Sequence, residues 1–526
     1  MMKNTILNIS KIAAAVLLVA GSATSCLEKY PGSYIPEEDA MQTFQDAEQH
    51  VVGIYSSLKS SSLYSGYLTL FPDIQADLVM ATLTNSNPYA GIWEWDIRPT
   101  NSMIESVYGS LYSVIGNCNF YLERVGDVIA SETNEDNLEL LDTYTGEVYA
   151  IRALCYSELI KCFCEAYPSS DADGNNPDDE AAKNKLGVVL RTKYSEPEPV
   201  KRASLYDSYQ LVLSDLAKAE ELLDDGDDDP TVNEGDEYDN YYISLAAVYA
   251  IHARVALNMR DWENAVTYSS YVIDNEAFAL SGTSTNQVTG YPAFDSLWYY
   301  DTGSEIIWRI GFTQTSYGGA LGTAFLNYTR DYTYLYPDYV PAEWVINLYS
   351  EKDYRYQAYF ADESITGIPN GYSFEIPVPL VVKYWGNRSF TNTYQIYHVC
   401  MPKPLRLAEQ YLIRAEAYCR TNDTGLAAND LTTLSQSRGA GAVSIGTDWL
   451  ETISDERVKE LYMEGFRLND LKRWGMGFER TPNSYSQTEG NDLEISADDP
   501  LFVWPIPQND IEAPGSDIEG NESNNR

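Results

Sequence analysis

The sequence has 526 residues, of which 44% are apolar and 21% are charged, and its formal net charge is −43. A chain of this length can bury a large hydrophobic core. Its charge excludes nucleic-acid binding and attachment to anionic lipid headgroups, because both would be repelled. The remaining role of so many acidic side chains is to keep the protein soluble.

The first 25 residues have the pattern of an export signal. Lys3 and Lys11 are basic, residues 12–20 are apolar but too few to span a membrane, and five small residues precede Cys26. Cleavage before Cys26 fits lipoprotein processing, and it also fits an ordinary signal peptidase. We therefore expect a signal peptide at 1–25, followed by a tether at 26–42.

Apolar residues recur at helical spacing from about Thr43 onward. Helices are predicted at 46–59, 103–125, 145–163, 206–223, 245–257, 262–273, 405–419, 426–434 and 455–474. The last of these has Ser454 as its expected N-cap and Gly475 just past its end. Between 279 and 404 the periodicity fails, and short strands are predicted at 306–312 and 380–384. The fold class is therefore mainly α, with a loop-rich half that contains short strands.

Two of the predicted helix pairs carry alanines twelve residues apart. These are Ala253 with Ala265, and Ala415 with Ala427. Small residues at this offset let two antiparallel helices approach closely, as in tetratricopeptide-like hairpins. The two pairs are far apart in the sequence, so they do not predict a plain solenoid.

Six cysteines follow Cys26, and most lie in apolar helical patterns. They are Cys118, Cys155, Cys162, Cys164, Cys400 and Cys419. An even count in an exported protein permits disulfides, but this placement favours mostly free, buried thiols. The chain has only three histidines, so no zinc site is expected.

The acidic segment after residue 168 has a weak likeness to a calcium loop. Asp171, Asp173 and Asn175 alternate as calcium ligands do, but Gly174 is in the fourth place and Ala182 is in the twelfth. The expected state is a solvated acidic loop, and no cofactor or metal is predicted.

Catalytic motifs are missing from the sequence. It contains no G-x-S-x-G, no P-loop and no H-E-x-x-H. With 78 acidic residues, two carboxyl groups at glycosidase spacing will occur by chance, so a surface glycosidase stays open as an alternative. We predict that the protein is not an enzyme.

The aromatic composition is the positive signal for binding, with 43 Tyr against 14 Phe. Tyrosine suits a surface that has an apolar face and a wet edge. A sugar ring offers a flat patch of C–H groups to such a face, and its hydroxyls need polar partners nearby. Tyrosine-rich loops are therefore candidates for glycan binding.

Two loop-like stretches combine these features. Trp93 and Trp95 alternate, so in an extended chain they would share one face and form a platform for a sugar. The ligand-binding residues predicted in the first stretch are Asn85, Asn87, Tyr89, Trp93, Trp95 and Asp96. Those predicted in the second are Trp298, Tyr299, Tyr317, Tyr332 and Tyr334. The alternative is that these rings pack under loops or against a partner.

Several segments, in order along the chain, resemble the SusD/RagB family of outer-membrane nutrient-binding lipoproteins. The matching segments are the helix at 46–59, Gly146-Glu147 with Arg152-Ala153, the helix at 406–418, the run from Glu456 to Gly475, and Trp504-Pro505-Ile506-Pro507-Gln508. The last two are the most specific. The resemblance covers nearly the whole chain after Cys26.

This resemblance implies a SusD-like fold in which a tetratricopeptide-like scaffold supports a loop-rich binding half. It implies an N-terminal region at 43–240 and a C-terminal region at 241–526, which form one compact unit. It also implies lipidation at Cys26 and anchoring to the outer membrane, facing the cell exterior. Signature pairs such as Glu464 with Arg467 are expected to tie helices together.

The function that the resemblance implies is non-enzymatic glycan binding and delivery to a SusC-like TonB-dependent transporter. The main alternative is a surface lid that binds peptides or another nutrient.

Overall fold

The computed structural model describes residues 40–525 except 84–85, 87, 90, 195–199, 225–239, 328–336, 368–373, 391–397, 483–485 and 487–493. The predicted signal peptide, Cys26 and most of the predicted tether lie outside the described residues. The fold is mainly helical, as predicted. One continuous apolar core includes residues from Met41 to Ile518.

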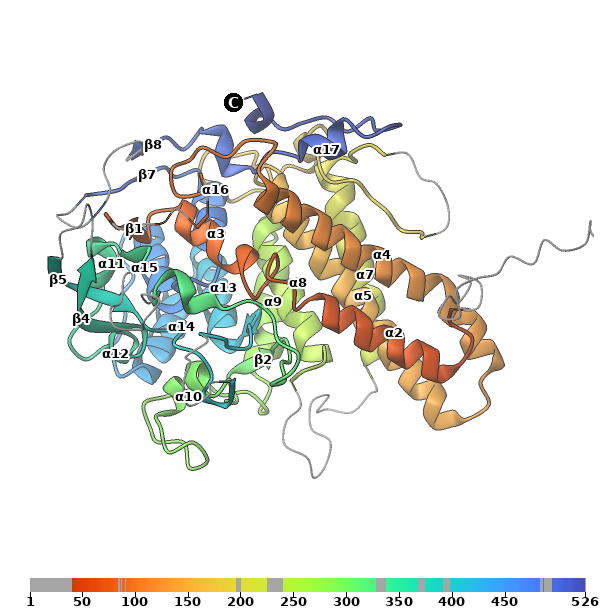
Figure 1. Cartoon of the computed structure of the whole chain (residues 1–526), viewed down its shortest axis with the longest axis horizontal. Helices are drawn as coiled ribbons and strands as arrows, with labels where there is room; N and C mark the ends of the chain where they lie inside the picture. Colours follow the sequence, from red (N-terminus) through yellow and green to blue (C-terminus); the bar gives the residue numbers. More distant parts are fainter. Residues whose placement is uncertain are drawn as a thin grey trace, which may run out of the picture.

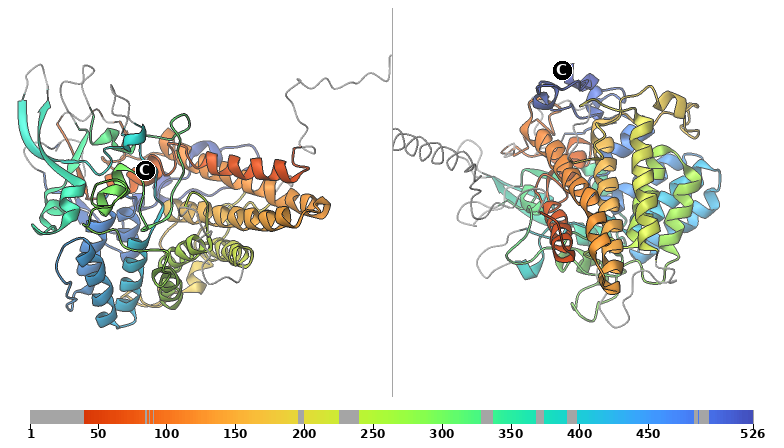
Figure 2. Two further views of the ribbon diagram at one scale, coloured as in Figure 1. Left: turned by 90° about the horizontal axis from the view of Figure 1, so that it is seen from below. Right: turned by 90° about the vertical axis from the view of Figure 1, so that its right-hand side faces the viewer.

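The N-terminal part of the described chain contains the following helices, several of which extend as an elongated arm at one end of the molecule (Figure 1). They are α2 (Phe44–Ser57), α3 (Tyr67–Gln75), α4 (Ser102–Ser131), α5 (Glu135–Phe163), α6 (Asp179–Ala182) and α7 (Leu205–Leu223). Of these, α2, α4 and α5 extend farthest from the body, side by side (Figures 1 and 2). Helix α5 starts ten residues earlier than predicted, because Asn134 caps it and its first two turns are mostly polar and exposed.

The body of the molecule contains the hairpin helices and several short ones. They are α8 (Leu245–Met259), α9 (Trp262–Ile273), α10 (Ala293–Tyr299), α11 (Glu343–Asn347), α12 (Tyr354–Tyr359), α13 (Leu407–Arg420), α14 (Thr424–Ser437), α15 (Trp449–Leu461), α16 (Arg467–Trp474) and α17 (Gln508–Ile511). The four alanines predicted to make close contacts are fully buried. Since α9 also packs against α13, the two hairpins lie side by side although they are far apart in the sequence.

Four two-stranded antiparallel ladders are present in the described residues. They pair β1 (Val79–Ala81) with β3 (Tyr339–Pro341), β2 (Ile306–Trp308) with β6 (Leu405–Arg406), β4 (Phe360–Gly367) with β5 (Phe374–Val381), and β7 (Phe478–Glu479) with β8 (Glu494–Ile495). The predicted strands at 306–312 and 380–384 coincide only in part with β2 and β5. The β4–β5 ladder lies at the end of the molecule opposite the helical arm (Figure 1).

The predicted helix at 455–474 is wrong, because the chain breaks it into α15 and α16. Gly465 has φ +86° and lies so close to α3 that a Cβ there would meet the carbonyl oxygen of Leu68 at 2.8 Å. The carboxylate of Asp73 accepts the N–H groups of Gly465 (3.0 Å) and Arg467 (2.8 Å). Burial raises the pKa of Asp73 to about 7. Gly475 ends α16 in the left-handed conformation, as predicted, whereas Ser454 lies inside α15.

Buried ion pairs join the helices to the loop-rich half. Glu460 contacts three arginines, each at most 1% exposed. They are Arg355 (3.4 Å), Arg406 (3.1 Å) and Arg438 (2.8 Å). The expected pairing of Glu464 with Arg467 is wrong.

Glu464 instead pairs with Lys383 at 2.6 Å and with Arg406 at 2.7 Å. Arg467 pairs with Asp77 at 2.8 Å. These contacts bind the segments that follow β5 and α3 to the C-terminal helices, so the signature charges do hold elements together, as expected, but through other partners.

The six cysteines of the described chain are all buried and free, which confirms that prediction. Burial raises the pKa of every one of these thiols.

Glu147 on α5 is a buried carboxyl group, so its effect on stability should depend on pH. Its carboxyl group accepts the hydroxyl of Tyr55 at 2.9 Å, and burial raises its pKa from 4.5 to about 8. Its contribution to stability is therefore fully present below about pH 4.5 and is lost as the pH rises through about 8. Glu147→Gln cannot ionise, so relative to wild type it should gain roughly 2–4 kcal/mol of unfolding free energy between pH 5 and pH 9.

Urea denaturation at pH 5, 7 and 9 would measure this difference. Glu48→Gln, on the neighbouring helix α2, corrects for the loss of one negative charge. A difference between Glu147→Gln and wild type that stays flat with pH would show that the carboxyl group is not held neutral by burial.

Candidate functional site

The two tryptophans predicted to form a sugar platform lie in the core. Trp93 is 2% exposed and Trp95 is 3% exposed. The indole N–H of Trp93 donates to the carbonyl of Val79 at 3.1 Å, and that of Trp95 donates to the carbonyl of Gln75 at 2.6 Å. Neither ring presents a free face to solvent, so the prediction of an exposed platform at these residues is corrected.

The local backbone explains this burial. Residues 91–95 form a turn rather than a strand, and Trp95 has φ +55°, so the alternation rule for extended chains does not apply. The buried guanidinium of Arg480 holds the turn. It donates to the carbonyls of Gln75 (2.6 Å) and Trp93 (2.6 Å) and lies 4.5 Å from the centre of the Trp93 ring.

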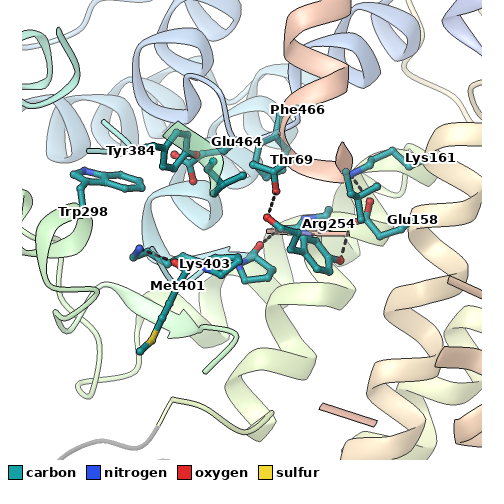
Figure 3. Close-up of a pocket in the computed structure, with 15 residues that line it drawn as sticks. Thr69, Glu158, Lys161, Arg254, Trp298, Tyr384, Met401, Lys403, Glu464 and Phe466 are labelled. Carbon is teal, nitrogen blue, oxygen red and sulfur yellow. Dashed lines mark hydrogen bonds and ion pairs between the residues drawn. The ribbon is translucent and has the colours of Figure 1, made fainter. Parts of the chain in front are cut away.

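Trp298 is also buried, at 2% exposure, and its burial likewise corrects the prediction that it binds a ligand. The ammonium of Lys383 lies 4.2 Å from the centre of its ring, and that of Lys403 lies 5.2 Å from it. The ring lines an internal cavity of about 30 Å³ together with Glu464 and Arg254 (Figure 3). A cavity of this size holds about one water molecule, so it cannot be a glycan site.

Tyr89 is the residue of the first stretch that keeps a partly exposed ring. It stacks on the buried ring of Tyr339, with centres 6.1 Å apart and planes at 3°. It also makes edge-to-face contacts with Phe71 (5.1 Å) and Tyr67 (6.3 Å). One face of the Tyr89 ring therefore packs against β3, and the residue as a whole is half-buried.

Polar groups lie beside this aromatic cluster. Asp338, next to Tyr339, accepts the backbone N–H of Ser86 at 2.6 Å and its hydroxyl at 2.8 Å. Asp96 is exposed and pairs with Arg98 at 3.1 Å. Of the second predicted stretch, Tyr299 is half-buried at the end of α10, and Tyr317 is 48% exposed. Asn85, Asn87, Tyr332 and Tyr334 lie outside the described residues.

Sequence reasoning missed the partners of Tyr89. Tyr67 and Phe71 belong to α3, a nine-residue helix interrupted by Pro72 and therefore without a clear helical signal. Tyr339 belongs to a three-residue strand whose partner, β1, is more than 250 residues away in the sequence. The Tyr-rich composition pointed to this region, but no spacing rule could have paired these rings.

The acidic segment 171–175 turns its carbonyl groups toward arginines. Arg420 donates to the carbonyl of Asp173 at 2.5 Å, and Arg260 donates to that of Gly174 at 2.9 Å. The indole N–H of Trp262 donates to the carbonyl of Asn175 at 2.6 Å. The backbone oxygens of this loop are therefore engaged by side chains of α9, of α13 and of the turn after α8. Among the described residues, no cluster of three or more His, Cys, Asp or Glu side chains is arranged to hold a metal ion.

Within the described part of the chain, no helix combines the length and apolar character needed to cross a membrane.

Two family models match the chain. Residues 393–518 match the model of the SusD family, and residues 33–257 match a model described as "starch-binding associating with outer membrane". SusD-like protein P25 of Formosa agariphila is 24% identical over 538 residues, which cover 89% of this chain and 90% of the relative.

Solved structures share the fold. A SusD superfamily protein from Bacteroides thetaiotaomicron superposes with a TM-score of 0.74 at 25% identity, covering 91% of this chain and 99% of that one. A laminarin-binding SusD-like protein superposes with a TM-score of 0.65 at 20% identity, covering 92% of this chain and 100% of that one.

Proposed function

From the premise that this chain belongs to the SusD/RagB family, we propose that it binds an oligo- or polysaccharide at the cell surface, without cleaving it, and passes it to a SusC-like TonB-dependent transporter. The observation that carries the proposal is the rigid tyrosine cluster around Tyr89. The names of the starch-binding family model and of the laminarin-binding relative support glycan as the ligand class.

The proposed contact is stacking of a sugar ring on the exposed part of Tyr89. The ring is already immobilised on Tyr339, so binding would cost little additional side-chain entropy. The remaining proposed ligand-binding residues are Asn85, Asn87, Asp96, Tyr299, Tyr317, Tyr332 and Tyr334. Their polar groups would orient the sugar more than they strengthen its binding, because each hydrogen bond replaces one made to water.

Tyr89→Ala is expected to weaken glycan binding by at least about 2 kcal/mol, roughly 30-fold, since a central aromatic contact dominates a small interface. Isothermal titration calorimetry would measure this with the polysaccharide that wild type retains best in affinity gels containing neutral and acidic polymers. Soluble starch and laminarin would be the first two polymers tested.

Two controls accompany this measurement. Tyr194→Ala removes another exposed tyrosine, outside the proposed site, and should bind as wild type does. Product analysis after long incubation should show no shortened glycan. A wild-type protein that binds no polymer of the panel would overturn the proposed function, and a stable Tyr89→Ala variant with native affinity would move the site elsewhere.

We further propose that Cys26 carries the lipid anchor in the outer membrane. Several acyl chains are needed for stable anchoring, as a bacterial lipoprotein has. Cys26→Ala should shift the protein from the membrane fraction to the soluble fraction in cells that lack the transporter. Retention of this variant on the membrane under those conditions would place the anchor elsewhere.

The second candidate is a lid that binds peptides or another nutrient. Tyrosine clusters also bind peptides, so this candidate shares the geometry of the first. Peptide uptake measured beside glycan uptake, in cells that contain the protein and its transporter, would separate the two.

A further inference from the structure

A second tyrosine cluster lies on the helical scaffold, on elements that do not carry Tyr89. It consists of Tyr249 on α8 with Tyr268 and Tyr271 on α9. The ring centre of Tyr249 lies 5.0 Å from that of Tyr271 and 5.8 Å from that of Tyr268, and the rings of Tyr268 and Tyr271 lie 5.8 Å apart. Tyr271 is 52% exposed and the other two are half-buried. The hairpin thus presents a fixed aromatic surface to solvent.

A buried histidine lies directly under this cluster. The imidazole of His252 stacks on Tyr268, with centres 3.7 Å apart and planes at 17°. It is 8% exposed, and its Nδ1 is buried without a hydrogen-bond partner among the described residues. Burial lowers its pKa to about 4, so the ring is neutral near pH 7. Because Nδ1 is itself buried, a ligand cannot reach it directly, and the imidazole serves to hold the Tyr268 ring in place.

Carboxylates border the three rings. Burial raises the pKa of Tyr249 most, and the charges of Glu220 and Asp224 at the end of α7 raise it further, so that it reaches about 12. Burial raises the pKa of Tyr268 most, and the charges of Glu220 and of Asp261, at the start of α9, raise it further. The cluster therefore combines ring faces, phenolic hydroxyls and hydrogen-bond acceptors, which are the groups that a sugar needs.

The size of the surface decides between ligand classes. Among the described residues of α7, α8 and α9, Tyr271 is the one strongly exposed large apolar side chain. A stable protein interface buries on the order of 1,200–2,000 Å² and needs more apolar anchors than this. The rings also touch one another, so they leave no gap that could enclose a cation. One or two sugar rings fit a surface of this size.

We propose that Tyr249, Tyr268 and Tyr271 form a second glycan contact, which holds another stretch of the polymer bound at the Tyr89 site. This inference rests on the proposed glycan-binding function. Two linked contacts raise the affinity for a long chain without changing the affinity for a fragment that reaches only one of them. The scaffold then helps to retain polysaccharide, in addition to supporting the loops.

The test compares long and short ligands. Calorimetry would measure binding of the best-retained polymer of the panel and of its own hexasaccharide, for laminarin the β-1,3-glucan hexasaccharide and for starch maltohexaose. Tyr271→Ala should weaken polymer binding at least 5-fold and leave hexasaccharide binding at the Tyr89 site unchanged. Tyr271→Phe keeps the ring and should bind the polymer nearly as wild type does. Tyr194→Ala is the control, because Tyr194 is 46% exposed and lies outside the cluster.

Hydrogen exchange on the wild-type protein gives a readout that needs no variant. Polymer, but not hexasaccharide, should slow exchange at residues 262–273. Native polymer affinity in Tyr271→Ala together with unprotected α9 would overturn the second contact while leaving the Tyr89 site in place. Absence of any polymer binding by wild type would overturn both the proposed function and this inference.

Discussion

Trp93→Ala is expected to lower the free energy of unfolding by about 3–5 kcal/mol, because it opens a large cavity in a closely packed core. The substitution also removes the hydrogen bond to Val79 and the ring on which the guanidinium of Arg480 lies. Urea denaturation and calorimetric melting would measure the loss. Tyr317→Ala truncates an exposed ring and should leave the melting temperature nearly unchanged.

The same variant separates a structural role from a binding role. Under conditions in which Trp93→Ala is fully folded, this variant should bind glycan with nearly native affinity, because the Trp93 ring of the wild type has no exposed face. If Trp93→Ala melts as wild type does but no longer binds glycan, Trp93 contacts the sugar, which would contradict the burial described above.

Glu460→Gln is expected to cost about 3–5 kcal/mol, the usual effect of removing one partner from a buried ion pair. Although burial alone would raise the pKa of Glu460, Arg438 and Arg406 hold it well below its usual range. The native side chain is therefore a carboxylate at every ordinary working pH. Its neutral replacement leaves three buried guanidinium groups with one negative charge fewer.

Chemical denaturation would measure this loss, and Glu221→Gln supplies the matched control. Glu221 pairs with Lys218 at 2.7 Å on the solvent-exposed surface of α7, where screening by water removes most of the benefit. This control should leave the denaturation midpoint unchanged. Equal midpoints for Glu460→Gln and wild type would show that the buried network does not hold the helices to the loop-rich half.

Helical periodicity was sufficient to predict most of the scaffold. The boundaries of α9 match the prediction, and the alanine spacing identified both hairpins. The break between α15 and α16 could not be predicted, because it depends on a carboxylate about 390 residues away, Asp73, which accepts the N–H groups at the start of α16. Gly465 alone does not specify such a break, since single glycines also occur inside helices.

The candidate site was predicted less well, for two physical reasons. Alternation places side chains on one face only when the backbone is extended, and the left-handed conformation of Trp95 turns both indoles inward. Burial also depends on partners from distant segments, such as Arg480 over Trp93. Of the two tyrosine clusters described here, one includes Tyr89, which was predicted to bind, and the other lies on helices for which no binding residues were predicted.

The buried thiols have a practical consequence for studying this protein in solution. Thiol-specific dyes and spin labels react with exposed thiolates, and the six cysteines of the described chain offer neither exposure nor a low pKa. In a soluble form that lacks Cys26, a single cysteine introduced on the arm or near Tyr89 would therefore be the preferred target of the label. Paired labels could then report distances between the arm and the loops as glycan is added, without removing any native cysteine.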